Sequence, residues 1–488
     1  SGKILLMGCW CMHLRTPPPG RGRWLYTLLV LAAGAALRLW FIHAHPQIQG
    51  DSLVYGDIAT NWLTHGIYGH SVGHPSGVTT IEPTLVRLPG YPAFLALCFA
   101  LFGLANYQAV LYLQALIDLV TCLLIAGLAA RICGPPAARI ALLLAALCPF
   151  TATYVASPLT ETLSIFCVAL GFRALAEVLE RPRLQWSAAL GFSWSFATLL
   201  RPDGGLLAVV LWTALLVYGR KSLGFSTALR LALAAGLLSL LPFAAWTVRN
   251  ARTFHVFQPL APRYANDPGE FESPGFVRWI RTLTADFTTT NEIYWAGNSD
   301  RIDPANLPAR AMDDAVQEQE THRLLQDYNA ITTLTPEIDA RFAQLAQERI
   351  RAHPFQYYVT LPLLRLSDMW LRPRVETMNI QLRWWQYSQH PAETRLALFF
   401  GVLNLAYLVA AFLGALRWPR LAGAMVSLII LRSLLLATLE APEPRYTLEC
   451  FPLVIVLAAC YFTTWLVPGG SLSWKSSDAR GLLYWMFL

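Results

Sequence analysis

Charged residues are scarce in this chain of 488 residues. Asp, Glu, Lys and Arg together make up only 14% of it, whereas hydrophobic residues make up 55% and the mean hydropathy is +0.43. Soluble domains carry about 25% charged residues, so this deficit excludes an ordinary soluble protein. Apolar runs near the roughly 20 residues that a membrane helix needs recur along the chain, and the alternating strands of a membrane barrel are absent. The sequence therefore predicts an all-α integral membrane protein.

The chain also lacks the cysteine and histidine patterns that hold metals or disulfides. Most of the nine cysteines lie inside apolar runs, where a thiol behaves as a small hydrophobe. Cys9 and Cys11 do not have the spacing of a redox or zinc pair, and His65, His70 and His74 do not follow a helical ligand spacing. We therefore expect neither a metal site nor a disulfide framework.

Lysine is nearly absent, and arginine supplies almost all of the positive charge. The formal net charge of +7 is spread over loops, a pattern that suits anionic lipid headgroups better than nucleic acid. Basic residues recur in alternate loops, whereas the loop 44–86 contains neither Lys nor Arg. Under the positive-inside rule, this pattern places both termini in the cytoplasm and the loop 44–86 on the extracytoplasmic side.

The apolar runs predict a bundle of about 10–11 transmembrane helices, with interfacial helices and a large external loop. The clearest spans lie near residues 24–43, 107–130, 139–157, 160–179, 186–200, 203–219, 229–248, 395–416, 420–439 and 448–467. Apolar runs at 91–102 and 357–370 are expected to lie at the membrane interface. Residues 309–351 alternate charged and apolar residues at helical spacing, which predicts a small helical subdomain.

Five regions follow from this layout. The first span is expected to be a retained signal anchor, because no small-residue cleavage site follows it. The regions are a basic and disordered cytoplasmic leader (1–23), an N-terminal transmembrane module (24–250) with a first external loop (44–106), an extracytoplasmic helical region with an interfacial helix (251–393), C-terminal transmembrane helices (394–467) and a cytoplasmic tail (468–488).

An acidic loop directly follows the first span. Asp51 lies on its expected outer side, where a carboxylate can deprotonate an acceptor hydroxyl as a general base. A helix cap and an exposed loop acid are open alternatives for Asp51. Asp57 is a candidate for substrate binding, for capping or for a solvated position. Glu161 opens a later span, where it either faces Asp51 and orients a substrate or an arginine, or favours the positive end of the helix dipole.

Four arginines map to the outer ends of spans or to adjacent loops, namely Arg87, Arg201, Arg249 and Arg445. A single arginine there usually anchors a protein at the interface by reaching for lipid headgroups. Four on the side opposite the lysines indicate a phosphate site, because the guanidinium fork matches phosphate oxygens bidentately. Arg432 lies in the middle of a span and is expected to face a polar cavity.

The order of these motifs resembles a known family. The series is Asp51-x3-Tyr55-x3-Ala59, Gly66-x-Tyr68, Arg87-x-Pro89-Gly90-Tyr91-Pro92, Pro158-x2-Glu161, Arg201-Pro202, Arg249-Asn250 and Arg445-Tyr446-x5-Pro452. Over about residues 24–250 and 395–467, it resembles the GT-C membrane glycosyltransferases, in the family 39-like branch of protein O-mannosyltransferases and lipid A aminoarabinose transferases. In that family the catalytic Asp of the first external loop is often followed by Glu. Here Ser52 follows Asp51, so Glu161 or Glu82 would supply any second acid.

The resemblance implies a glycosyltransferase that moves a sugar from a polyprenyl-phosphate donor to an acceptor hydroxyl on the extracytoplasmic side. The reaction would be inverting, with Asp51 as the general base and Glu161 beside it. The donor phosphate would be bound by Arg201, Arg249 and Arg445. Further substrate contacts are expected from Tyr55, Asp57, Tyr68, Arg87, Tyr91 and Tyr446.

The same resemblance implies no metal and no cofactor besides the lipid-linked donor. The expected partners are that donor, an acceptor glycan, lipid or protein, and the surrounding lipids of a bacterial inner membrane. A GT-C-fold subunit without activity, inside a larger membrane complex, is an alternative that the missing acid after Asp51 favours. A transporter is disfavoured, because we find no internal repeat and, apart from Arg432, no charge pairs inside the spans.

Overall fold

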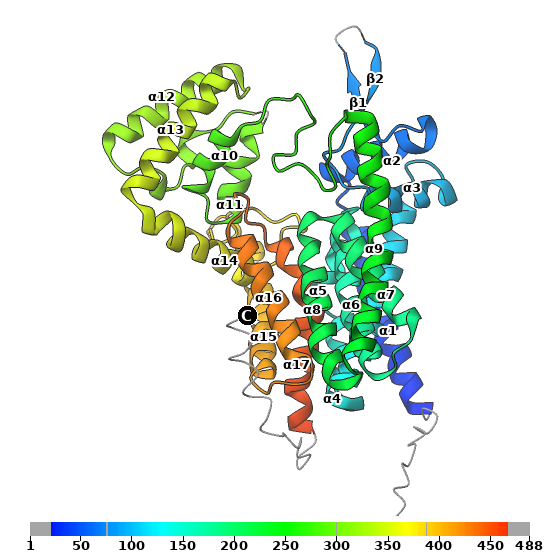
Figure 1. Ribbon diagram of the computed structural model, residues 1–488. Coiled ribbons are helices and arrows are strands. Elements are labelled where there is room, and N and C mark those ends of the chain that lie inside the picture. Colours follow the sequence, from blue (N-terminus) through cyan, green and yellow to red (C-terminus); the bar gives the residue numbers. More distant parts are fainter. Residues whose placement is uncertain (1–20, 75–76, 299, 387, 467–488) are drawn as a thin grey trace, which may run out of the picture.

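The computed structural model describes residues 21–466, except 75–76, 299 and 387. Within these limits the chain forms a bundle of long helices, and a β-hairpin and a helical subdomain project from the same end of it (Figure 1). We call this the hairpin end. Of the expected leader and tail, residues 1–20 and 468–488 lie outside the described part of the chain. The predicted fold class, an all-α membrane protein, is confirmed apart from two short strands.

Seven described helical stretches are long and apolar enough to cross a membrane. They are Trp24–Ala44 in α1 (Arg21–Ala44), Tyr107–Ala146 (α4), Glu161–Glu180 (α6), Pro202–Ser222 in the turn η2 (Pro202–Gly204) and α8 (Gly205–Ser222), Phe225–Phe254 (α9), Pro391–Ala415 (α15), and Pro444–Thr463 in η8 (Pro444–Cys450) and α17 (Phe451–Leu466). The shorter helices α7 (Leu184–Leu200) and α16 (Ala422–Ala437) pack in the same bundle. Since α4 contains two of the expected spans, each expected span has a helical counterpart.

α4 changes direction where two of the expected spans meet. Gly134 has a φ of 84° and is followed by two prolines, which cannot donate backbone hydrogen bonds. The span expected at 139–157 is too long, because the helix ends at Ala146. Pro149 forces the residue before it into an extended conformation and begins a new turn. The chain continues through α5 (Pro149–Ala152) and η1 (Thr153–Ala156) toward the start of α6.

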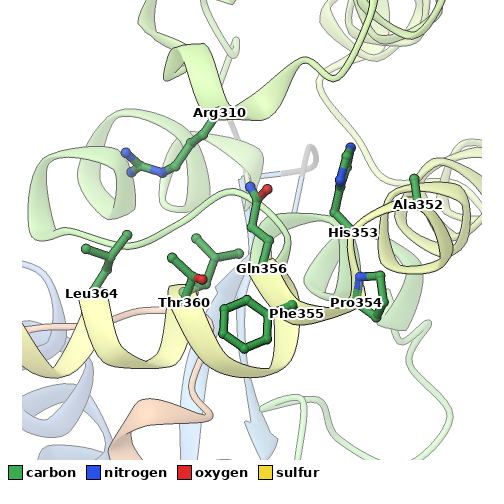
Figure 2. Close-up of a pocket in the computed structure, with 9 residues that line it drawn as sticks. Arg310, Ala352, His353, Pro354, Phe355, Gln356, Thr360 and Leu364 are labelled. Carbon is green, nitrogen blue, oxygen red and sulfur yellow. The ribbon is translucent and has the colours of Figure 1, made fainter.

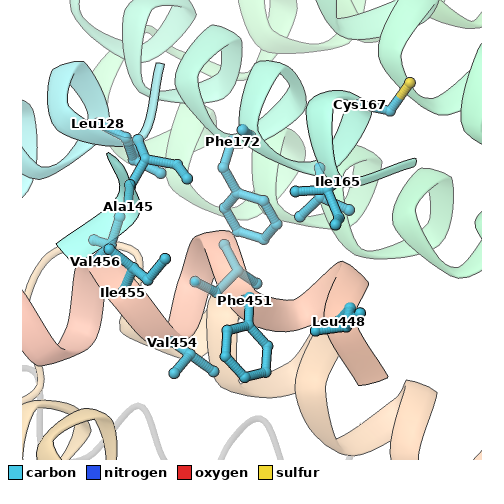
Figure 3. Packing of buried hydrophobic residues seen from close by; sticks show 14 of the residues in the cluster. Leu128, Ala145, Ile165, Cys167, Phe172, Leu448, Phe451, Val454, Ile455 and Val456 are labelled. Carbon is cyan, nitrogen blue, oxygen red and sulfur yellow. The ribbon is translucent and has the colours of Figure 1, made fainter. Parts of the chain in front are cut away.

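The bundle core lies where α17 packs against α4, α6 and α15. Figure 3 shows Phe451 of α17 facing the same interior as Leu128 of α4 and Phe172 of α6. A Cβ atom at Gly414 of α15 would overlap the backbone oxygen of Leu457 in α17. Glycine therefore permits these two helices to approach closely.

Arg38 of α1 and Asp118 of α4 form a buried ion pair inside the bundle. Arg38 Nε donates to Asp118 Oδ2 at 2.7 Å, and Nη1 donates to the carbonyl oxygens of Gly34 and Ala146. The prediction that the spans lack charge pairs is therefore wrong. Such a pair is tolerated in a bundle when its members are held by good hydrogen bonds.

We expect Asp118→Asn to destabilise the protein by about 3–5 kcal/mol, because it leaves the Arg38 charge buried without its anion. Replacing both charges, in R38M/D118L, should cost far less, since no charge then remains in the core. Thermal unfolding of the protein in nanodiscs measures both, with the exposed Asp327→Asn as a control. Equal losses in the single and the double variant would contradict this interpretation.

Cys133 of α4 and Cys460 of α17 form a disulfide with Cα atoms 5.7 Å apart. The expectation of no disulfide is wrong for this pair. The two cysteines are 327 residues apart in sequence, and only the packing of α17 on α4 brings them together. The remaining described cysteines are buried free thiols, namely Cys98, Cys122, Cys148, Cys167 and Cys450.

Arginines expected on the cytoplasmic side meet away from the hairpin end. Arg131 of α4 pairs with Glu177 and Glu180 of α6, Arg173 pairs with Glu177, and Arg420 pairs with Glu180. The structure thus keeps these loops on one side of the bundle, as alternating spans require. Which side faces the cytoplasm stays a prediction.

At the hairpin end, α1 leads into α2 (Asp51–His65), the antiparallel strands β1 (Gly69–Gly73) and β2 (Thr79–Pro83), and α3 (Gly90–Phe102). α3 corresponds to the short apolar run expected at the interface. A Cβ atom at Gly90 would lie 2.6 Å from the backbone of Leu199, so glycine allows α3 to rest against the end of α7. The first loop is therefore packed onto the bundle rather than free.

The helical subdomain at the hairpin end has its own core. α10 (Pro274–Arg281), α12 (Ala315–Ile331) and α13 (Pro336–Ala352) enclose the fully buried Trp279, with Phe342 against it. Arg365 of α14 (Leu361–Leu371) ties the subdomain to the bundle, since its guanidinium donates to the carbonyl oxygens of Thr284 and of Ala437 in α16. Shorter elements complete the region: α11 (Phe287–Thr289), η3 (Thr290–Tyr294), η4 (Ala296–Asn298), η5 (Pro304–Asn306), η6 (Ala309–Ala311) and η7 (Gln356–Thr360).

Candidate functional site

Asp51 is the first residue of α2, at the hairpin end. Gly50 takes the N-cap position with a φ of 53°, and no side chain caps this helix. The capping interpretation of Asp51 therefore does not hold. Its Oδ1 instead accepts a hydrogen bond from Arg87 Nη2 at 2.6 Å, and both side chains are about one-third exposed, at 36% and 32%. The carboxylate is thus held in place and remains accessible.

Two tyrosines connect Asp51 to the interior of the bundle. The Arg87 guanidinium lies 5.7 Å from the ring centre of Tyr55, whose ring meets Tyr91 edge-on at 5.2 Å. Tyr91 donates to Gln114 Oε1, and Gln114 in turn donates to the carbonyl of Ser157. This chain of contacts fixes the start of α2 relative to the turn that precedes α6.

Glu161, the first residue of α6, is 1% exposed and lies between two arginines. Its Oε1 is 3.4 Å from Arg201 Nη1 and 3.7 Å from Arg445 Nη1, and its Oε2 has no hydrogen-bond partner among the described residues. Arg201 leaves α7 in an extended conformation imposed by the following proline, and Arg445 belongs to η8. The predicted meeting of these two arginines is therefore seen in the structure.

Tyr55 lies within electrostatic range of both charged groups, Asp51 with Arg87 and Glu161 with Arg201. Burial raises the pKa of the Tyr55 hydroxyl, so the phenol stays neutral between them. That Asp51 and Glu161 share one cavity stays a prediction.

A second layer of charges lies behind Arg201. Arg432 Nη2 is 2.9 Å from Asp203 Oδ2 and 2.9 Å from Glu449 Oε1, and Arg201 Nε is 3.4 Å from Asp203 Oδ1. The sequence predicts that Arg432 faces a polar cavity, and in the structure these two acids lie beside its guanidinium group. Neither Asp203 nor Glu449 was predicted as a site residue, although the sequence Arg201-Pro-Asp and the mid-span Arg432 were available signals.

Tyr446 provides an aromatic surface between the two arginines. The Arg201 guanidinium lies 4.4 Å from the centre of its ring and the Arg445 guanidinium 5.4 Å. Its hydroxyl donates to Glu443 Oε1, and Arg445 Nε is 2.6 Å from Glu443 Oε2. Glu443 therefore orients both Tyr446 and Arg445.

Arg249 does not join the other two arginines. Its Nη1 donates to the carbonyl of Thr84 at 2.7 Å, and its Nη2 donates to the carbonyl of Tyr68 at 2.6 Å. The guanidinium also lies over the rings of Tyr68, Trp246 and Phe254. The expectation that Arg249 converges with Arg201 is thus wrong. The Arg249 guanidinium instead binds carbonyl groups at the base of the β-hairpin and so connects the hairpin to α9.

Other predicted residues of the first loop mainly shape the hairpin. Asp57 Oδ2 accepts from Ser71 N at 2.7 Å and its Oδ1 from Ser71 Oγ at 2.8 Å, which ties β1 to α2. Tyr68 is buried and donates to the carbonyl of Arg87. Glu82 is exposed on β2 and makes no ion pair with a described residue.

Among the described residues, no group of three or more His, Cys, Asp and Glu side chains is arranged to hold a metal ion. Two histidines of the first loop have local partners instead. His65 Nδ1 contacts the hydroxyl of Thr64, and His74 Nε2 contacts that of Thr80.

A cavity of about 490 Å³ lies outside this site, beside the start of α14. Figure 2 shows Arg310 and His353 over a floor that includes Phe355, Thr360 and Leu364. It contains none of the residues predicted to act on a substrate. Arg310 is moreover paired with Asp286 at 2.6 Å.

Comparisons with known proteins match part of this chain to a described family. Residues 82–246 match the family model described as "Dolichyl-phosphate-mannose-protein mannosyltransferase". This stretch contains Arg87, Tyr91, Glu161 and Arg201, whereas Asp51 precedes it. No curated protein sequence matches the chain.

Solved structures also resemble the chain. Two are crystal structures of the Archaeoglobus fulgidus oligosaccharyltransferase: one tethered to an acceptor peptide (TM-score 0.50, 12% identity, 90% of this chain and 49% of that chain) and one in the apo form (0.50, 11%, 91% and 51%). Another is ArnT from Cupriavidus metallidurans in the apo state (0.38, 16%, 91% and 77%). The chain spans about half the length of the oligosaccharyltransferase. The resemblance to the GT-C membrane glycosyltransferases is supported over residues 82–246 by the family match, and the oligosaccharyltransferase structures share the fold of this chain.

Proposed function

We propose that this chain, which has the GT-C glycosyltransferase fold, transfers a sugar from a polyprenyl-phosphate donor to an acceptor hydroxyl. The observation that carries the proposal is the meeting of Arg201 and Arg445, from opposite halves of the chain, at the buried Glu161. Independent interfacial anchors would have no reason to meet. The family whose model matches residues 82–246 is named for a dolichyl-phosphate-linked sugar, which supports this donor class.

In this proposal Asp51 is the general base. Its Oδ1 is held by Arg87, and Oδ2 takes the proton of the acceptor hydroxyl. The hydroxyl oxygen forms a bond to the anomeric carbon, while the bond from that carbon to the phosphate oxygen breaks on the opposite face. The polyprenyl phosphate leaves with the electron pair, and the configuration of the sugar inverts.

The leaving phosphate gains negative charge, which Arg201 and Arg445 would stabilise. Arg201 Nη1 makes a long hydrogen bond of 3.4 Å to Glu161. Arg445 is paired with Glu443 through Nε and Nη2. Arg201 Nη2 and Arg445 Nη1 have no hydrogen bond to a described residue, so each guanidinium group keeps a donor for a phosphate. Glu161, which contacts both, would keep the two guanidinium groups next to each other. We leave Arg249 out of this set, because its donors are engaged elsewhere.

We further propose that the site needs no metal, since the guanidinium groups already supply positive charge to the leaving group. Tyr55, Tyr91 and Tyr446 would provide surfaces for the sugar and the lipid phosphate. The hairpin end would face the extracytoplasmic side of a bacterial inner membrane, as the distribution of basic residues indicates.

We expect the purified full chain, in nanodiscs containing undecaprenyl-phosphate-linked sugars and EDTA, to release undecaprenyl phosphate over time. Water acts as a slow acceptor in this assay, so the native acceptor is not required. Mass spectrometry of the extracted lipid measures the product. A folded protein that consumes none of a panel of such donors would contradict the proposal and support the alternative of a non-catalytic subunit.

A further inference from the structure

One short segment links the helical subdomain to the two turns that build the site. Residues 374–377 lie between α14 and α15, and their side chains reach η8, which carries Arg445, and η1, which precedes Glu161. The sequence of this segment contains no recognised motif. Its contacts nevertheless join three parts of the chain that are remote in sequence.

Arg374 binds the η8 side. Its Nη1 donates to the carbonyl of Pro444 and its Nη2 to Thr447 Oγ1, both at 2.6 Å, and the guanidinium lies 4.8 Å from the ring centre of Phe451. Nε donates to Asn404 Oδ1. Since these acceptors engage its donors, Arg374 positions η8 rather than a substrate.

Glu376 and Thr377 bind the η1 side. The Thr377 and Thr153 hydroxyls lie 2.6 Å apart in a buried contact. The Tyr154 hydroxyl donates to Glu376 Oε1 at 2.9 Å. The carbonyl oxygen of Tyr154 accepts from the hydroxyl of Thr162, the residue after Glu161. The phenol of Tyr154 lies within electrostatic range of Glu161 and Arg445.

Like Oε2 of Glu161, the second oxygen of Glu376 lacks a hydrogen-bond partner among the described residues. This Oε2 atom of Glu376 is buried, although the residue as a whole is half-buried. Burial raises the pKa of this carboxyl group. An unsatisfied buried acceptor is costly, and natural structures keep few of them without a ligand or a function.

We propose that Glu376 is a second substrate-facing acid of the site and accepts a hydrogen bond at Oε2 from a hydroxyl of the acceptor. The inference rests on the proposed glycosyltransferase function. Glu376 has no ion pair with a described arginine, so the donor's charged end belongs with Arg201 and Arg445 and not with Glu376. An acceptor hydroxyl is a neutral donor and suits Oε2. The helical subdomain would thereby take part in acceptor recognition.

The test measures sugar transfer to an acceptor hydroxyl separately from the total consumption of the donor. The full chain in nanodiscs is given undecaprenyl-phosphate-mannose in buffer with 1 M glycerol, and the ratio of glyceryl mannoside to free mannose is measured. In Glu376→Gln the amide oxygen can still accept from Tyr154, but an N–H group replaces the acceptor Oε2. We expect this ratio to fall about tenfold, with total donor consumption changed less than about twofold.

Two control variants distinguish acceptor binding by Glu376 from a purely structural role. Glu393→Gln alters another carboxylate of the same region, which accepts from the backbone of Gln381, and should leave the ratio unchanged. If Glu376 only braced Tyr154, Tyr154→Phe would lower the ratio and Glu376→Gln would not. That outcome would overturn the inference, as would donor hydrolysis by the wild type without any transfer to glycerol. Absence of all donor turnover in the wild type would instead overturn the proposed function itself.

Discussion

Asp51→Asn is expected to lower the rate of sugar transfer by about 10²–10⁴-fold, the usual contribution of a general base. The amide has nearly the shape of the carboxylate but cannot take a proton from the acceptor hydroxyl. Binding of undecaprenyl phosphate should be nearly unchanged, because the proposed phosphate ligands are Arg201 and Arg445. Initial rates of donor consumption and equilibrium binding of the lipid, both in nanodiscs, measure the two effects.

A loss of folding stability is not expected to account for the lower transfer rate of Asp51→Asn. The Asp51–Arg87 pair is about one-third exposed, and pairs of this kind contribute about 0–1 kcal/mol. Asp327→Asn, which removes the anion of another accessible pair with Arg341, is the matched control and should keep full activity. A tenth or more of the wild-type rate in Asp51→Asn would show that another group accepts the proton.

The features that the sequence predicts well are local. Runs of apolar residues identify the helices of the bundle, because the backbone groups of a segment in the membrane must form their hydrogen bonds within that segment. Asp51 could be selected because a carboxylate beside a membrane span is costly without a purpose. The glycine and prolines near residue 134 mark the end of one span and the start of the next.

Features that depend on packing could not be predicted. Arg38 and Asp118 lie on different helices, as do Cys133 and Cys460, and no local pattern relates the members of either pair. Arg249 occupies the same kind of position as Arg201 at the outer end of a span. Only the structure shows that its donors are engaged by the carbonyl groups of the β-hairpin.

Glu376 illustrates a different limit. It lies in a region of soluble composition with no recognised motif, and a glutamate there would be assigned to the surface by default. Its importance comes from Tyr154 and from the neighbouring contacts of Arg374 and Thr377. Residues outside the stretch that the family model matches, such as Glu376, are therefore the ones most easily missed.

The phosphate site makes the second large prediction, on the binding of undecaprenyl phosphate to the protein in nanodiscs. Arg445→Lys keeps the charge but loses the planar fork, so we expect the Kd to rise about tenfold. Arg445→Gln removes the charge as well and should raise the Kd about a hundredfold. Arg341→Lys, at an exposed position, is the matched control and should leave the Kd unchanged.

A change at Glu161 is expected to shift the Kd for undecaprenyl phosphate in the opposite direction, which a general structural defect would not do. Its carboxylate already faces both arginines, so a bound phosphate must share them with a buried negative charge. Glu161→Gln removes that repulsion while keeping an oxygen that accepts from the guanidinium groups. The same substrate phosphate should therefore bind more tightly to Glu161→Gln and more weakly to Arg445→Lys. If both variants weaken binding equally, these residues only hold the fold together, and the donor phosphate must bind elsewhere.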